Sequence, residues 1–147
     1  MSAGELASFL AGEHTMTVAT IGPGGRPHLM PVHYYVDAEG CPVTWTYARS
    51  QKTINLERDP RATLQVEAGD AYQELRGAML EVDVEIIRET SKVAEIGLRV
   101  VARYGGPGTD PADVQGADRE RVVAQAPKRV GLRFHVTRAV TWDHRKL

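Results

Sequence analysis

The sequence contains a single cysteine, Cys41, among 147 residues. One thiol cannot form a disulfide within the chain, and it cannot supply the cysteine pairs from which structural zinc sites are commonly built. No apolar run approaches the roughly 18 residues of a membrane-spanning helix, and the first twelve residues lack the basic start and the long apolar stretch of a signal peptide. We therefore expect a cytoplasmic protein in a reducing compartment, with no membrane partner.

An excess of charge of one sign is also missing. Lysine and arginine number 18 against 19 aspartates and glutamates, a formal net charge of -1, and the basic residues are scattered. Broad, salt-sensitive binding to nucleic acid depends on clustered basic residues, so we expect no nucleic-acid partner. With 42% hydrophobic and 25% charged residues, the chain has ordinary globular composition and the length of one compact domain, which we predict to span residues 1–147.

The histidines form no familiar catalytic or metal-binding pattern. His28 and His33 lie five positions apart in one expected strand, where an odd separation puts side chains on opposite faces, so they do not share a metal. The remaining histidines, His14, His135 and His144, are isolated, and their sequence neighbours suggest no Ser-His-Asp or Cys-His arrangement. Cys41 falls in an expected turn, and we interpret it as a packing or exposed residue rather than a nucleophile.

Short runs of alternating apolar and polar residues, separated by turn residues, dominate the first ninety positions. This alternation is typical of half-buried strands. The strands expected are 15–21, 27–36, 42–47, 61–67, 74–87 and 130–142, the last with a bend near Thr137. The glycine-rich segment 22–25 lacks the strand-to-helix setting of a dinucleotide-binding loop, and we interpret it as a hairpin turn. Because short turns join consecutive strands, we predict a six-stranded, closed antiparallel barrel.

Helical periodicity is confined to a few segments. Ser2 and Glu5 form a capping-box pattern that predicts a leading helix ending at Glu13. A second, short helix is expected over 50–58, because Asp59-Pro60 stops it. Two further helices are expected near 90–104 and 111–124. The glycine-rich segment 105–116 contains the loop between them, and two interpretations of it stay open: a gate over a site or a surface excursion.

The segment 44–61 holds the one candidate site with a coherent chemistry. A strand ends there and a helix begins, and the first turn of that helix carries Ser50 and Lys52. Unpaired N–H groups and the positive end of the helix dipole attract anions, and a hydroxyl and an ammonium group add to that attraction. The alternative is that Ser50 is an ordinary N-cap and Lys52 a solvated side chain. The residues alone indicate a phosphate site without excluding that alternative.

The chain as a whole resembles the split β-barrel flavin and deazaflavin oxidoreductases, the pyridoxamine 5'-phosphate oxidase-like superfamily. The resemblance rests on the leading helix, the hairpin around 24–28, the strand-helix-strand block 45–66 and the ending Val140-Thr141-Trp142-Asp143. The terminal Trp-Asp-His-Arg-Lys run is similar to actinobacterial members that use coenzyme F420, a deazaflavin. The expected fold is therefore a mainly β split barrel with short peripheral helices.

This resemblance implies a set of cofactor-binding residues and no catalytic residue. It assigns the cofactor phosphate to Ser50 and Lys52, and it includes Gln51, which lies between them, among the cofactor-binding residues. It places the flavin or deazaflavin ring against the strand segment Met30-Pro31-Val32, and because Pro31 has no N–H, that strand is expected at a sheet edge or a bulge. The remaining expected contacts are Trp45, Thr46 and Trp142, with a core or interface role as the alternative for both tryptophans.

The implied function is an F420-dependent oxidoreductase that transfers hydride to a small conjugated substrate, in which the protein binds and orients the cofactor. The resemblance also implies a homodimer with cofactor sites between subunits. Two alternatives stay open: an FMN-binding oxidoreductase or flavin reductase of the same fold, and a non-catalytic flavin- or ligand-binding protein. FMN-binding members usually carry Ser-Arg-Lys where this chain has Ser50-Gln51-Lys52, and a glutamine near the position of Tyr72. These departures weaken the case for FMN without establishing the deazaflavin.

Overall fold

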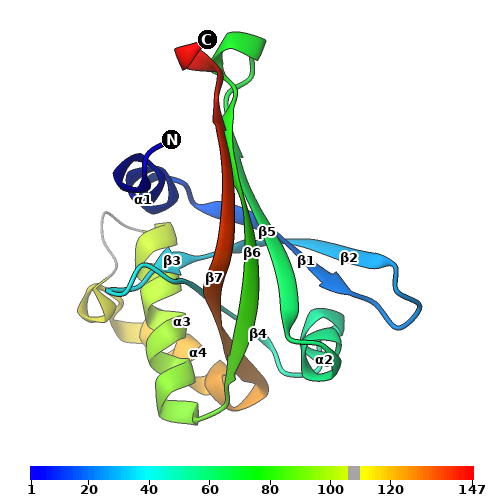
Figure 1. Cartoon of the computed structure of the whole chain (residues 1–147). Helices are drawn as coiled ribbons and strands as arrows, with labels where there is room; N and C mark the ends of the chain where they lie inside the picture. The colour runs from blue at the N-terminus through cyan, green and yellow to red at the C-terminus, as the bar shows by residue number, and fades with distance from the viewer. Residues whose placement is uncertain (106–109) are drawn as a thin grey trace.

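The computed structural model describes residues 1–105 and 110–147. Its centre is a curled antiparallel sheet of seven strands in the order β2-β1-β5-β6-β7-β4-β3, which forms a split barrel (Figure 1). The strands are β1 (Thr15–Ile21), β2 (Pro27–His33), β3 (Tyr35–Val36), β4 (Pro42–Tyr47), β5 (Arg61–Ala68), β6 (Arg76–Ile87) and β7 (Arg129–Asp143). The predicted antiparallel architecture is confirmed, but the sheet has seven strands instead of six and is open, with β2 and β3 at its edges.

The seventh strand arises from an interruption at Tyr34. The expected strand 27–36 is divided there into β2 and β3, which form the two edges of the sheet. The ring of Tyr34 is buried, and its hydroxyl donates a 2.6 Å hydrogen bond to the carbonyl oxygen of Leu10. A buried tyrosine needs such a partner for its polar end. The side chain therefore anchors the chain where it passes from one sheet edge to the other.

In the part of the chain that the structure describes, four α-helices pack around the sheet: α1 (Ala3–Gly12), α2 (Gln51–Arg58), α3 (Thr90–Gly105) and α4 (Gly116–Gln125). The predicted capping box of α1 is present, with Ser2 and Glu5 bonded reciprocally. The expected helix 111–124 is shorter than predicted, because only a 3₁₀ turn, η2 (Pro111–Asp113), precedes α4, and another, η3 (Ala126–Lys128), follows it. The interpretations of the loop within 105–116 fall largely on residues 106–109, which lie outside the described residues.

Three apolar cores hold the described elements together, of which the smallest joins α3 to α4 through Leu98, Ala102, Val114 and Val122. The curled sheet encloses the largest core, in which Val18, Leu64, Leu80 and Phe134 are almost fully buried and Phe9 of α1 covers one side. The second core lies outside the sheet, where α3 packs on β3 and β4 through Tyr35, Val43, Ile96 and Val100. Both faces of β4 are therefore covered, and this explains why its predicted alternation of buried and exposed residues is weak.

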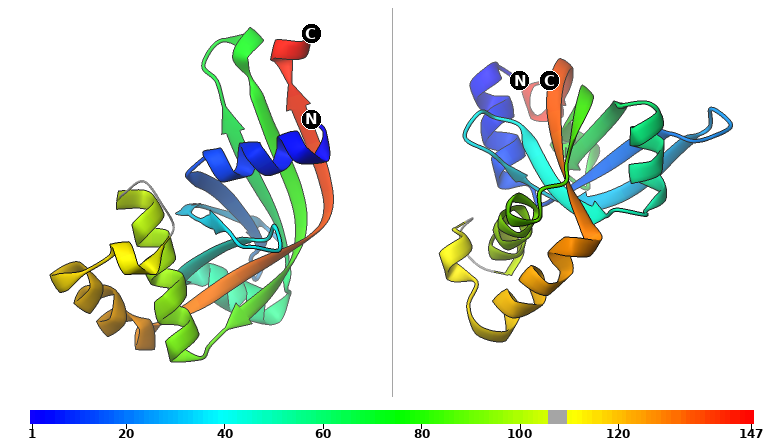
Figure 2. Two further views of the ribbon diagram at one scale, coloured as in Figure 1. Left: turned by 90° about the vertical axis from the view of Figure 1, so that its left-hand side faces the viewer. Right: turned by 90° about the horizontal axis from the view of Figure 1, so that it is seen from below.

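Strands β5, β6 and β7 continue together toward one end of the molecule as a long arm, which ends in the 3₁₀ turns η1 (Tyr72–Glu74) and η4 (His144–Lys146) (Figures 1 and 2). The predicted bend is confirmed as a register shift, because Glu81 pairs with Arg138 while the next residue, Val82, pairs with Val136. A bulge of one extra residue bends a strand and increases its twist. β7 therefore bends at Thr137, where the arm begins.

In the described part of the chain, no helix is both long and apolar enough to cross a membrane.

Candidate functional site

Ser50 lies at the start of α2 and caps it. Its backbone is extended, and its hydroxyl oxygen accepts a hydrogen bond from the N–H of Thr53 at 3.4 Å and lies 3.0 Å from the hydroxyl of Thr53. No acidic residue lies in the first turn of α2. The positive end of the helix is thus not neutralised by its own sequence, which is the condition for anion binding at a helix start.

A buried amide fixes α2 against the barrel. Asn55 is fully buried, and its Nδ2 donates a 3.0 Å hydrogen bond to the hydroxyl of Thr20 on β1, while its Oδ1 accepts one from Gln51 at 2.8 Å. Arg58, at the end of α2, donates to the carbonyl oxygen of Ile21. The start of α2 is therefore held rigidly, and a ligand there meets an ordered helix end.

Lys52 is half-buried at this helix start and has no carboxylate within ion-pair distance among residues 1–105 and 110–147. Burial lowers the pKa of its ammonium group, and the nearby guanidinium of Arg129 lowers it further. Two positive charges thus approach each other with no anion between them. Such an arrangement is favourable only when an anion completes it.

Arg129 is the member of this site that sequence reasoning missed. It is the first residue of β7 and pairs with Tyr47, the last residue of β4, so the sheet register alone brings it to α2. Its guanidinium lies 4.0 Å from the ring centroid of Tyr47 and 4.3 Å from that of Trp45. The side chain oxygen of Gln125 accepts two bonds from it, of 2.9 and 3.1 Å. No local pattern signals this contact, because 77 positions separate the residues numbered 52 and 129.

The other predicted residues of segment 45–51 take structural positions. The ring of Trp45 packs against α3 so closely that a Cβ added at Gly97 would lie 2.6 Å from it. Thr46 is buried on the opposite face of β4. Gln51 uses its amide group to bind Asn55 and is exposed. Trp45 therefore supports the site indirectly, because one face of its ring holds Arg129.

The predicted ring-contacting segment lies on an edge strand, as the proline indicated. Met30 and Pro31 of β2 are exposed, whereas Val32 packs against the main core. His28 shares a face with Met30, since alternate residues of a strand point the same way. The Nδ1 atom of His28 is buried and has no hydrogen-bond partner among the described atoms. A buried polar atom without a partner is costly, and a bound group could supply that partner here.

Trp142 is not brought to this site within one chain. It lies on the arm, where its ring covers Gly77 so tightly that a Cβ there would lie 2.3 Å from it. Arg129 and Trp142 are near opposite ends of β7, and about thirteen extended residues span roughly 40 Å. Two surface hollows also lie elsewhere: one between α1 and the arm, near Arg76, and one beside Arg61, and neither is lined by a predicted cofactor residue.

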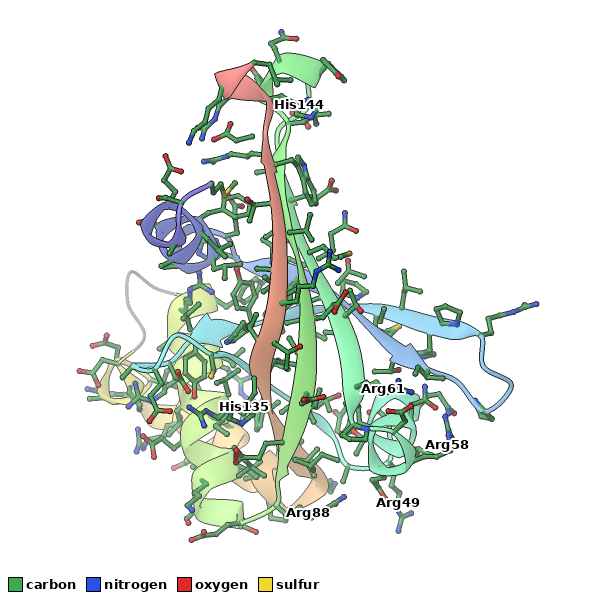
Figure 3. The ribbon with its side chains drawn as sticks, in the orientation of Figure 1. Arg49, Arg58, Arg61, Arg88, His135 and His144 are labelled. Carbon is green, nitrogen blue, oxygen red and sulfur yellow. The ribbon has the colours of Figure 1, made fainter. Side chains whose placement is uncertain are left out.

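The arrangement at α2 can therefore hold an anion and does not by itself supply acid–base chemistry. A hydroxyl, an ammonium and a guanidinium are the groups that bind phosphate well. Arg49, in the turn before α2, adds a further exposed cation and points away from the sheet (Figure 3). In the described residues, no group of three metal-ligating side chains is present. The residues at α2 thus fit the phosphate of a cofactor.

Comparison with known proteins identifies the family of this fold. The sequence profile of the pyridoxamine 5'-phosphate oxidase family matches residues 2–142. The conserved hypothetical protein Rv2991 from Mycobacterium tuberculosis has 42% identity and a TM-score of 0.86, over 99% of this chain and 87% of that one. The likeness to that protein therefore extends over nearly the whole chain.

Two less similar structures share the fold. An F420 reductase has 23% identity and a TM-score of 0.67, over 90% of this chain and 94% of that one. A FAD-binding protein from Mesorhizobium loti has 14% identity and a TM-score of 0.70, over 96% and 94% of the two chains. With the profile match over nearly its whole length, the chain belongs to the pyridoxamine 5'-phosphate oxidase family and to its superfamily of split-barrel flavin and deazaflavin oxidoreductases.

Proposed function

We propose that this protein is an F420-dependent oxidoreductase that anchors the phosphate of the deazaflavin at the start of α2 and delivers hydride to a small conjugated substrate. The observation that carries the proposal is the pair Lys52 and Arg129, two cations at a helix N-terminus without a carboxylate partner in the described residues. Family membership and the shared fold of an F420 reductase support it.

In the proposed reaction, the residues of this chain bind and orient the cofactor. Ser50, Lys52 and Arg129 hold the phosphate by charge-assisted hydrogen bonds, each worth about 1.5–3 kcal/mol. The segment Met30-Pro31-Val32 of β2 would hold the ring. The deazaflavin, when bound, supplies the hydride chemistry. No side chain of the site is assigned a proton-transfer role, because the site lacks a paired acid and base.

We further propose a homodimer in which a second copy completes the cofactor site. The exposed edge strand β2 carries apolar side chains, with Leu29 58% and Met30 42% exposed. In a two-fold dimer each copy offers the same surface, so one interface completes two equivalent sites. Trp142 serves the site only as a residue of the second copy, because in its own chain it lies near the far end of β7.

A phosphate anchor accepts FMN as well as F420. The pair Lys52 and Arg129 therefore supports the FMN-dependent alternative equally well. Titration of the purified protein with F420, FMN and FAD, followed by intrinsic fluorescence, separates them. The proposal expects micromolar F420 binding and the oxidation of reduced F420 by a conjugated quinone such as menadione. FMN binding without an F420 response would overturn the choice of cofactor. Tight F420 binding without turnover of any acceptor would instead indicate a non-catalytic carrier.

A further inference from the structure

At the opposite end of β4 from the phosphate site, three side chains form a chain of contacts that no cofactor role explains. The Sγ atom of Cys41 lies 4.0 Å from Nδ1 of His135, and Nε2 of that histidine lies 3.0 Å from Oε1 of Glu85. His135 comes from β7, midway along the molecule (Figure 3). The sequence neighbours of Cys41 give no sign of this contact, because the histidine is 94 positions away.

The turn between β3 and β4 fixes the thiol. One carboxylate oxygen of Asp37 accepts hydrogen bonds of 2.9 Å from the N–H groups of Glu39 and Cys41. Its other oxygen accepts a 2.7 Å bond from Arg133, which is two residues before His135 on β7. Residues two apart in a strand share a face, so the same face of β7 ties down the turn and presents the imidazole to the thiol.

The charges around Cys41 make a free thiolate unfavourable. Burial raises the pKa of its thiol, Arg133 opposes that effect, and the carboxylates of Asp37, Glu39 and Glu85 raise the pKa further. The thiol therefore needs a base to become a nucleophile. If Nε2–H of His135 donates to Glu85, Nδ1 is left as an acceptor facing the sulfur. A nucleophile, a base and a carboxylate that orients the base is the arrangement that activates cysteine in enzymes.

We propose that Cys41 is a modification site that forms a mixed disulfide with a small disulfide, with His135 as the base and Glu85 as the residue that positions it. The thiol proton passes to Nδ1 of His135 while the sulfur attacks one sulfur of the incoming disulfide. A new S–S bond forms, the old one breaks, and the leaving thiolate takes the proton. Cys41 is oxidised and the incoming disulfide is reduced to one thiol.

Because the chain has no other cysteine, this adduct blocks the thiol of Cys41 until an outside thiol removes it. No second thiol in the chain can resolve the mixed disulfide, so an external thiol must remove it. Three carboxylates against one guanidinium give the surroundings a net negative charge. A cationic disulfide such as cystamine is therefore the expected reagent, and an anionic one such as dithiodipropionate is disfavoured.

The test is the rate of adduct formation, followed by intact-protein mass. Cystamine is expected to add once to the native chain at least about tenfold faster than dithiodipropionate at low salt, with the difference shrinking as salt is added. His135→Asn is expected to slow addition about tenfold or more, Glu85→Gln by a smaller factor, and Cys41→Ser abolishes it. His144→Asn, which changes the histidine of η4 at the tip of the arm, is the matched control and leaves the rate unchanged.

The pH profile separates a base from a structural residue. If His135 is the base, the rate is expected to depend less steeply on pH in the wild-type protein than in His135→Asn, where the thiol must ionise alone. Equal rates and equal profiles for the two proteins, each shown to be folded by its thermal transition, would overturn the proposal. If His135→Asn does not fold, equal rates of the wild-type protein with the two disulfides at low salt overturn it as well. Cofactor binding at α2 is unaffected by the adduct, so this test is independent of the proposed function.

Discussion

Arg129 and Arg133 lie four residues apart on β7 and pair with opposite ends of β4, yet their surroundings differ in charge. Arg133 is matched by carboxylates: Asp37 at 2.7 Å, Glu39, and Glu85 at 3.8 Å. Hydrogen bonds to Asp37 and Glu39 raise the pKa of its guanidinium. Arg129 has instead the neutral side chain of Gln125, two aromatic rings and the ammonium group of Lys52 nearby.

This difference distinguishes an arginine that stabilises the fold from an arginine whose charge is available to a ligand. A fold that satisfies its own arginine with carboxylates gains stability and leaves nothing for a ligand. A fold that orients an arginine with an amide and aromatic rings fixes its geometry while leaving its charge uncompensated. The Lys52–Arg129 end of β4 is therefore the proposed anion site, whereas the Arg133 end is an ion-pair cluster.

Cofactor affinity gives the largest expected contrast between the two ends. Lys52→Ala removes one charge-assisted contact to the phosphate, so the dissociation constant for the bound cofactor is expected to rise about tenfold or more, measured by fluorescence titration. Arg133→Ala removes a cation of the other end and leaves the constant within about twofold. Equal losses from both substitutions would move the phosphate away from α2.

Ser50→Asp is the matched control for the helix start itself. Aspartate caps a helix as well as serine does, so the thermal transition of the apo protein stays near that of the wild type. Its carboxylate repels a phosphate, and binding is expected to fall. A variant that keeps both stability and affinity would show that the ligand does not reach Ser50.

For the free energy of unfolding, we expect substitution of Arg133 to have a larger effect than substitution of Arg129. Arg133→Ala leaves three carboxylates without their shared cation and is expected to lower the free energy of unfolding by about 1 kcal/mol in chemical denaturation at neutral pH. Arg129→Ala loses stacking and one amide partner but relieves repulsion with Lys52, so its cost is smaller. A larger loss from Arg129→Ala would contradict the comparison.

The pH dependence of the free energy of unfolding tests whether the loss in Arg133→Ala comes from its ion pairs. Partial burial by itself would raise the pKa of Asp37, but hydrogen bonds from Arg133 and from the N–H groups of Cys41 and Glu39 outweigh it and lower the pKa. A carboxyl group with a lowered folded-state pKa contributes stability above its unfolded pKa, near 4, and loses it as the pH falls through the folded value. The gap between wild type and Arg133→Ala is therefore expected to narrow between about pH 5 and pH 2.

The smallest expected effect is a gain. Because burial and Arg129 lower the pKa of Lys52, its charged form is disfavoured in the folded protein, a penalty present at neutral pH and relieved as the pH rises through the folded-state pKa. Lys52→Met removes the charge and keeps the apolar stem. We expect the apo protein to gain about 0.5 kcal/mol, reduced by the screening of a half-exposed group. Unchanged or lower stability in thermal unfolding without ligand would show that Lys52 is not under electrostatic strain.

Much of the fold was predictable because it depends on local patterns. The capping box at Ser2, the helix stop at Asp59-Pro60 and the alternation of β1 and β5 each arise from neighbouring residues, and each is confirmed. The break at Tyr34 was not predictable. It depends on a hydrogen bond to α1 and on packing against the main core, and both belong to the assembled fold.

The candidate site divides in the same way. Ser50 and Lys52 were found from sequence because a helix start and its first turn are local features. Trp142 was predicted from resemblance and is far from α2 in its own chain. It can therefore contribute to the site only in the proposed homodimer. Arg129 has no local signal at all, because its neighbourhood is set by the register of β7 against β4.

The sequence by itself determined the strands, the helix ends and the composition that leaves one thiol and no excess charge, because each depends on residues a few positions apart. Only the tertiary structure decided which cations have carboxylate partners. Strand pairing placed Arg133 against the turn that carries Asp37 and Glu39, and placed Arg129 beside Lys52. Electrostatic compensation depends on distance in space, and the register of the barrel sets those distances.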